Sequence, residues 1–139
     1  MAVNQVEEVP GFKQVSLNQL LTELNRQGGF SASVVATGDG LPIASLAPGL
    51  DTDTVAAMVA FVRGVVERAR GQMGFARVDE VSVVDDDRIR LVCRYFVIAD
   101  EALILAVVLP ANQRYRKLTN QAVKAIKQIW TPQGPPGRA

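Results

Sequence analysis

The sequence predicts an α/β (α+β) fold: a five-stranded antiparallel sheet in the order 2-1-5-4-3, with the central helix on one face and the first and last helices on the other. Apolar residues recur at helical spacing in three segments and alternate at strand spacing in others. Residues 102–109 contain no polar side chain, so this strand should lie in mid-sheet under helices on both faces. Pro42 lacks an N–H, which places its strand at a sheet edge.

A flexible extension and a short helix are expected to open the chain. Residues 1–15 contain Pro10-Gly11 and little periodicity, which is typical of an extension. From Ser16, a plausible N-cap, leucine recurs at helical spacing until Gly28-Gly29. We therefore expect one domain over residues 16–130. Residues 131–139 are rich in Pro and Gly and are expected to be disordered.

The expected strands form a hairpin and, after the central helix, a three-stranded meander. Gly38-Asp39-Gly40 tolerates the positive φ angles of a hairpin turn, and Asp85-Asp86-Asp87 and Asp100-Glu101 mark the later turns. The third strand has no proline or comparable protection, so it should form an open edge of the sheet. The strands are predicted at residues 30–37, 41–46, 78–84, 89–97 and 102–109.

The central helix, expected from Thr54 to just before Gly74, is apolar on more than one side. Such a helix cannot rest on a single core, so a second surface must cover it. Ala56, Ala60 and Gly64 form a stripe of small residues opposite the core-facing arc. This stripe would let a second backbone approach closely, or it reflects only the helix propensity of alanine. The expected core-facing arc is Val55, Met58, Val59, Phe61, Val62, Val65, Val66 and Ala69.

Three weaker signals have two interpretations each. Three arginines share one face of the fourth strand: Arg88, Arg90 and Arg94. They could bind an anion, but the favoured interpretation is that they pair across strands with acidic residues. The basic face of the last helix, expected at residues 114–130, is interpreted as solvated rather than as a nucleic-acid surface. Cys93 is in register with apolar neighbours, which favours a buried hydrophobe over a reactive thiol.

Composition argues against several function classes. The 139 residues carry a net charge of +1, so no nucleic-acid partner is indicated, and the apolar runs are too short for membrane insertion. A single cysteine cannot form an internal disulfide, which fits a cytoplasmic location. The chain has no histidine and no motif for a phosphate loop or a nucleophile. We therefore expect association and not catalysis, with no cofactor and no metal.

Four segments together resemble the roadblock (dynein light-chain) family over about residues 17–129. The most specific is Asp39-Gly40-Leu41-Pro42-Ile43-Ala44-Ser45, which resembles the family's hairpin signature. The others are Leu20-Leu21 followed by Gly28-Gly29, Ala56-Ala57-Met58 in the central helix, and Ala102-Leu103-Ile104-Leu105-Ala106-Val107 before the last helix. The resemblance implies a roadblock/profilin-like fold.

The resemblance also implies a homodimer in which the central helices pack together and the third strands pair. It implies a small Ras-like GTPase as partner, and relatives of the bacterial gliding-motility type accelerate GTP hydrolysis by such a switch. The segment Asn112-Gln113-Arg114-Tyr115 departs from the Leu-Gly common in the family, and Pro in the tail excludes a helical extension. A small-ligand sensor and a structural light chain are the alternatives. The expected dimer residues are Ala56, Ala57, Ala60, Phe61, Gly64, Glu67, Arg68, Val78, Glu80, Val81, Ser82 and Val84.

Overall fold

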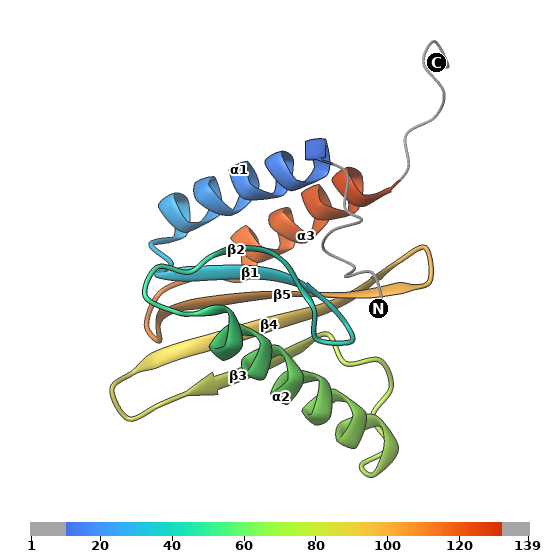
Figure 1. The fold of residues 1–139 in the computed structure, drawn as a ribbon. Coiled ribbons are helices and arrows are strands. Elements are labelled where there is room, and N and C mark those ends of the chain that lie inside the picture. Colours follow the sequence, from blue (N-terminus) through green and yellow to red (C-terminus); the bar gives the residue numbers. More distant parts are fainter. Residues whose placement is uncertain (1–10, 132–139) are drawn as a thin grey trace.

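A five-stranded antiparallel sheet lies between two layers of helices (Figure 1). The computed structural model describes residues 11–131. The strand order is β2-β1-β5-β4-β3, as predicted, with α1 and α3 on one face and α2 on the other. The elements are α1 (Gly11–Gly28), β1 (Ala32–Thr37), β2 (Pro42–Leu46), α2 (Thr52–Gly71), β3 (Glu80–Val84), β4 (Ile89–Ile98), β5 (Glu101–Pro110) and α3 (Arg116–Trp130).

Each face of the sheet has its own apolar core, and β5 contributes to both. Leu103, Leu105 and Val107 face α1 and α3, whereas Ile104 and Ala106 face α2. All five side chains are at most 2% exposed. Because side chains alternate along a strand, a strand that packs on both cores needs apolar residues at consecutive positions, and β5 has them from Ala102 to Leu109. The central position predicted for residues 102–109 is confirmed.

The first helix begins earlier than predicted. Residues 11–15 are helical, so the prediction of a helix start at Ser16 is wrong. Contacts with other elements hold this first turn: Lys13 Nζ donates to the carbonyl of Trp130 at 3.0 Å, and Gln14 donates to the carbonyl of Ile43 at 2.9 Å. Periodicity cannot reveal such contacts. The predictions for residues 1–10 and 132–139 lie outside the described residues.

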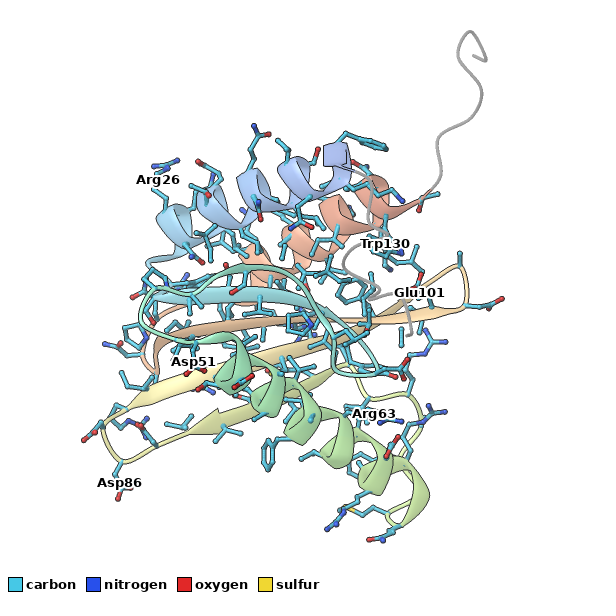
Figure 2. All side chains as sticks on the ribbon, viewed as in Figure 1. Arg26, Asp51, Arg63, Asp86, Glu101 and Trp130 are labelled. Carbon is cyan, nitrogen blue, oxygen red and sulfur yellow. The ribbon has the colours of Figure 1, made fainter. Side chains whose placement is uncertain are left out.

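The end of α3 is tied to the sheet by an indole. Trp130 Nε1 donates to Glu101 Oε1 at 2.9 Å, so the last helical turn is anchored at the β4–β5 turn (Figure 2). The helix starts at Arg116 rather than at the predicted Arg114. Within residues 11–131, no helix has both the length and the apolar character needed to cross a bilayer.

The second helix packs on the sheet through a narrower stripe than predicted. Val55, Val59, Val62 and Val66 are 1–3% exposed, at the spacing of one helix face. Phe61 is 58% exposed, so its expected core-facing position is wrong. The helix begins at Thr52, not Thr54, because the Asp51 side chain accepts the Thr54 N–H at 2.7 Å and caps the first turn.

Candidate interaction surface

The outer face of α2 carries small and apolar side chains that nothing in residues 11–131 covers. Ala57, Ala60 and Phe61 are exposed, and Ala56 and Gly64 are half-buried. A Cβ placed on Gly64 would meet no atom within 4 Å. Glycine in a helix interior costs about 1 kcal/mol relative to alanine. Since no contact within the described chain requires this glycine, its presence calls for an external reason.

The free edge of β3 adjoins this face. Tyr95 N–H donates to the Asp79 carbonyl at 2.9 Å, and Asp85 N–H donates to the Ile89 carbonyl at 3.0 Å. Antiparallel pairing alternates, so odd-numbered residues of β3 direct their backbone groups at β4 and even-numbered residues direct theirs outward. No described strand lies beyond β3. The residues with outward backbone groups are Glu80, Ser82 and Val84.

Apolar side chains of β3 extend the uncovered surface. Val81 packs half-buried against the α2-side core, and Val78, just before the strand, does the same. Alternation puts Val83 on the same sheet face as Val81, and it is 43% exposed. Val84 points to the opposite face and is 37% exposed. Val83 is not among the dimer residues that the family resemblance implied, although it shares a sheet face with Val81.

A cluster of charges fixes the beginning of β3 to α3. Arg116 forms an ion pair with Asp79 at 2.7 Å and also pairs with Glu80. The Tyr115 hydroxyl donates to Glu80 at 2.6 Å, and Arg94, which is buried, reaches Asp79 at 3.3 Å. The Arg116 hydrogen bond, with support from Arg94, lowers the pKa of Asp79, and the bond to Glu80 raises the pKa of Tyr115. The Glu80 side chain is thus engaged within its own chain, and its backbone remains free.

The three arginines predicted to share a face have different roles. The acidic pairing expected for Arg94 is confirmed by its contact with Asp79. For the other two it is wrong: Arg90 donates to the Ser82 hydroxyl at 3.0 Å, and Arg88 lies in the β3–β4 turn with φ of 64°. Left-handed geometry at that turn takes Arg88 out of the ladder.

Neither Cys93 nor the acidic turn forms a reactive or cation-binding centre. Cys93 is 1% exposed, and burial, with a smaller contribution from Glu80, raises the pKa of its thiol to about 12. The expected buried hydrophobe is confirmed. The Asp85 carboxylate accepts the Ile89 N–H at 2.9 Å, which is ordinary turn chemistry.

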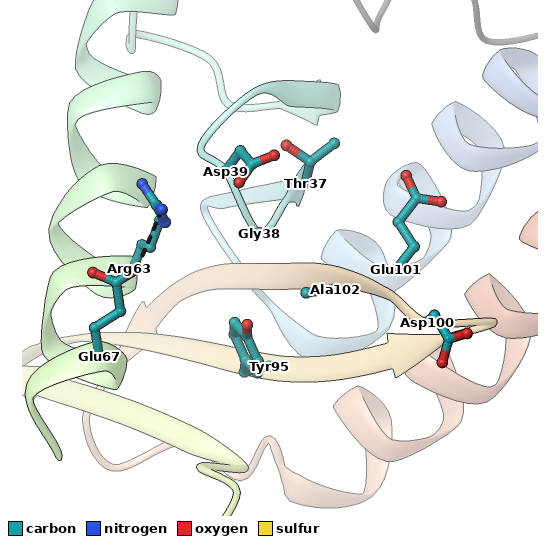
Figure 3. A pocket seen from close by; sticks show the side chains of 9 residues that line it. All are labelled: Thr37, Gly38, Asp39, Arg63, Glu67, Tyr95, Asp100, Glu101 and Ala102. Atoms are coloured by element: carbon teal, nitrogen blue, oxygen red, sulfur yellow. Dashed lines mark ion pairs between the residues drawn. The ribbon is translucent and has the colours of Figure 1, made fainter. Parts of the chain in front are cut away.

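A separate surface cavity of about 410 Å³ lies between α2, the β1–β2 hairpin and the β4–β5 turn (Figure 3). Arg63 and Glu67 of α2 form an ion pair at 3.2 Å on one side, facing Asp39 of the hairpin. Small-molecule sites are mostly apolar with few polar groups, whereas this lining is largely polar and includes four carboxylates. The cavity therefore gives the sensor alternative little support. Its lining is Thr37, Gly38, Asp39, Arg63, Glu67, Tyr95, Asp100, Glu101 and Ala102.

The structure brings most predicted association residues to one region. The small residues of α2 and Phe61 lie on its outer face, and Ser82 and Val84 lie on the free edge. Arg68 is exposed beside them, while Glu67 is directed toward the cavity. Met73 and Phe75, 68% and 57% exposed after the end of α2, were not predicted. Their sequence signal was two large apolar residues among glycines, outside any periodic segment.

Comparisons with known proteins agree with this fold. The family model described as Roadblock/LC7 domain matches residues 17–109. The gliding protein MglB from Thermus thermophilus superposes with a TM-score of 0.71 at 18% identity, covering 87% of this chain and 93% of that chain. A Roadblock/LC7 domain from Streptomyces avermitilis superposes with a TM-score of 0.61 at 21% sequence identity. The match covers 81% of this chain and 92% of that chain. At these identities the likeness shows a shared fold.

One curated relative gives a higher identity over a shorter stretch. An uncharacterized protein of Methanocaldococcus jannaschii is 35% identical over 68 residues, or 48% of this chain. The match spans 58% of that relative's length.

Proposed function

Because the chain belongs to the Roadblock/LC7 domain family, we propose that it works as a homodimeric scaffold or regulator that binds a small Ras-like GTPase. The observation that carries the proposal is an uncovered helix face beside an unpaired sheet edge. Both features are completed at once if a second copy binds there. An interface of this kind uses the same patch on both copies and closes on itself.

The alternation of β3 favours one pairing register. A two-fold axis through Ser82 sets Ser82 opposite its own copy and Glu80 opposite Val84 of the second chain. This register uses all three outward-facing residues, and a shift by two residues in either direction would leave some of them unpaired. It also sets Val81 opposite Val83 on the α2 side, giving apolar cross-strand pairs. Two five-stranded sheets would then join into one.

The same axis would bring the two α2 helices together above the joined strands. Helices approach closely where small side chains meet, and the outer face offers Ala57, Ala60 and Gly64. Phe61 would lose much of its 58% exposure in this contact. Fully burying an exposed aromatic side chain contributes about 2 kcal/mol. Helix packing and strand pairing thus support a single arrangement.

The GTPase would bind the composite surface that the pair creates. Two observations support this step. The chain belongs to a family whose members, as its sequence resemblance implied, have small GTPases as partners. Met73 and Phe75 are also exposed just after α2. Large apolar side chains grouped at a surface mark sites of protein association. Modulation of GTP hydrolysis is a separate property and is tested separately.

A binding measurement tests the proposal. The Ras-like protein encoded nearest to this gene is loaded with a non-hydrolysable GTP analogue or with GDP, and titrated with the purified protein. We expect at least about tenfold tighter binding to the GTP form, because a regulator must distinguish the two states. GTP hydrolysis is measured in parallel. Dimerisation without binding to any Ras-like protein from the source organism would favour a structural light chain instead.

The variant that links dimerisation to GTPase binding is Ala60→Glu. It puts a charge in the helix contact and leaves the sheet untouched. We expect this variant to be monomeric and to bind the GTPase weakly. If it stays dimeric, the assigned helix contact is wrong. If it is monomeric and binds with full affinity, the composite surface is not the binding site.

A further inference from the structure

The opposite side of the molecule carries a groove that the proposed dimer does not use. Helices α1 and α3 lie side by side on the sheet, with α2 on the other face (Figure 1). Two hollows run between them, of about 230 Å³ and 340 Å³. Ala125 lines both hollows, so they form one continuous groove. The first is lined by Leu20, Glu23, Leu24, Gln27, Leu118, Gln121, Ala122 and Ala125, the second by Phe12, Ser16, Ala125, Gln128 and Ile129.

The floor of the groove is apolar and incompletely covered. Leu20, Leu118 and Ile129 are only half-buried although they pack against the core. Phe12 closes one end and is 64% exposed. Each of these side chains would gain contacts from an apolar occupant, and burial of such side chains is the main favourable contribution to most protein association.

The helices around the groove are strongly basic, although the whole chain is nearly neutral. Lys13, Arg26, Arg116, Lys117, Lys124 and Lys127 are their basic side chains, and Glu23 is their one acidic side chain. Glu23 already accepts hydrogen bonds from Arg26 and Gln27 on its own helix, which neutralises the acidic charge at the groove. An anionic occupant would therefore meet little repulsion.

Two of these lysines lie on α3 next to residues that line the groove, although neither lines a hollow itself. Lys117 and Lys124 alternate with the lining residues Gln121 and Gln128 at intervals of three or four residues, so the four form a row along one side of α3. Both lysines are exposed. Lys127 lies farther round the helix, about 60° from Lys124, away from the groove. Apolar floor and basic row run parallel.

We propose that this groove binds an acidic amphipathic helix of a partner protein. Apolar residues of the helix, spaced i, i+3, i+4 and i+7, fill the two hollows, and its carboxylates face Lys117 and Lys124. The groove follows α1 from Gln27 to Phe12, a rise of about 23 Å, which accommodates a helix of about four turns. This surface lies across the sheet from α2, so the scaffold can hold this partner independently of its dimer contact.

Synthetic peptides test the proposal. A fluorescent 16-residue peptide with Leu at the four apolar spacings and Glu on its flanks is compared with a peptide in which Lys replaces every Glu. We expect the acidic peptide to bind at least about tenfold more tightly to the full chain. The double variant K117E/K124E should reverse that preference, whereas the matched control K127E should change it less than about twofold. Equal binding of both peptides, or equal effects of the variants, overturns the proposal.

Two further measurements distinguish a partner helix from other occupants of the groove. Vesicles containing phosphatidylserine are tested with the same variants: lysine-dependent vesicle binding without peptide discrimination would assign the face to a membrane and overturn the proposal. Deletion of residues 1–10 tests the chain itself as occupant, and a gain of peptide affinity above about tenfold would show that those residues fill the groove. Sedimentation of K117E/K124E should match the unmodified protein, so failure here is distinct from failure of the dimer.

Discussion

The two edges of the sheet are finished in different ways. At β2, Pro42 supplies no N–H, and side chains of α1 cover two carbonyls: Gln14 donates to Ile43 at 2.9 Å and Asn25 donates to Leu46 at 3.1 Å. At β3, no described element covers the outward backbone groups of Ser82. Within residues 11–131, one edge is closed by side chains of the same chain and the other is left open.

The difference favours β3 as the edge that pairs with another strand in the proposed dimer. Open edges promote unwanted pairing, and proteins commonly block them with proline, charge or a covering element. Here the chain blocks β2 twice and leaves β3 short, apolar and adjacent to an uncovered helix. The open edge is therefore best explained as an interface that the second copy completes. Two of the following predictions compare the two edges directly, and all are ordered from the largest expected effect to the smallest.

Breaking the open edge should have the largest effect. Ser82→Pro removes the outward N–H without touching the ladder to β4, and a two-fold pair would lose two hydrogen bonds at about 1 kcal/mol each. We expect the dimer dissociation constant to rise about 30-fold or more, measured by analytical ultracentrifugation. The control Ser82→Ala keeps the N–H and should remain dimeric. Equal behaviour of the two variants would contradict strand pairing.

Adding a side chain at the helix contact should have the second-largest effect. A Cβ at Gly64 or at Gly71 meets no atom within 4 Å, so alanine at either position should stabilise a single chain by up to about 1 kcal/mol. In the proposed dimer only Gly64 lies at the close approach of the helices. We expect Gly64→Ala to weaken the dimer about tenfold and the matched control Gly71→Ala to leave it unchanged. A stabilised, fully dimeric Gly64→Ala variant would show that the helices do not pack there.

Opening the closed edge should cost stability without affecting association. Asn25→Ala removes the donor that covers the Leu46 carbonyl, and the loss of one such hydrogen bond costs about 1 kcal/mol. Urea unfolding should show this decrease in the free energy of unfolding, while ultracentrifugation should show an unchanged dimer. A change in oligomeric state would mean that the β2 edge also takes part in assembly.

The smallest effect concerns the charge cluster that anchors β3. The pKa of Asp79 is lowered in the folded state, mainly by Arg116, so its contribution to stability is present above the ordinary pKa of about 3.9 and is lost as pH falls below that value. We expect Asp79→Asn to flatten the dependence of the urea midpoint on pH between about 4 and 2.5. An unchanged slope would show that this ion pair makes no net contribution.

Sequence patterns predicted the strand order and the open edge because both depend on local residue types. Pro42 identifies one edge, and the unbroken apolar run at 102–109 identifies the centre. The start of α1 was missed because Lys13 and Gln14 are held by distant segments of the chain. Phe61 was assigned to the core because a helical wheel gives the apolar face of a helix but not the width of the stripe that contacts the sheet. Its 58% exposure depends on how the valine stripe rests on the sheet.

The site was predicted in outline and corrected in detail for a similar reason. Helical spacing identified Ala60 and Gly64, and the family resemblance, together with the open edge predicted for the third strand, implied Val81. The engagement of Glu80 by Tyr115 and Arg116 depends on residues 35 or 36 positions away, which no local pattern specifies. Local sequence patterns therefore indicate which surface is the candidate for association, and tertiary contacts decide which of its side chains remain free.

Disulfide trapping at the edge tests the central claim most directly. In the proposed register two Ser82→Cys residues face each other with Cα atoms about 5.5 Å apart, within the range of a disulfide. Val84→Cys residues would lie roughly 14 Å apart. The native Cys93 is buried, with a thiol pKa raised to about 12, and should not interfere. On mild oxidation we expect a covalent dimer from Ser82→Cys and none from Val84→Cys. Failure of Ser82→Cys to cross-link, or equal cross-linking at both positions, would contradict the account.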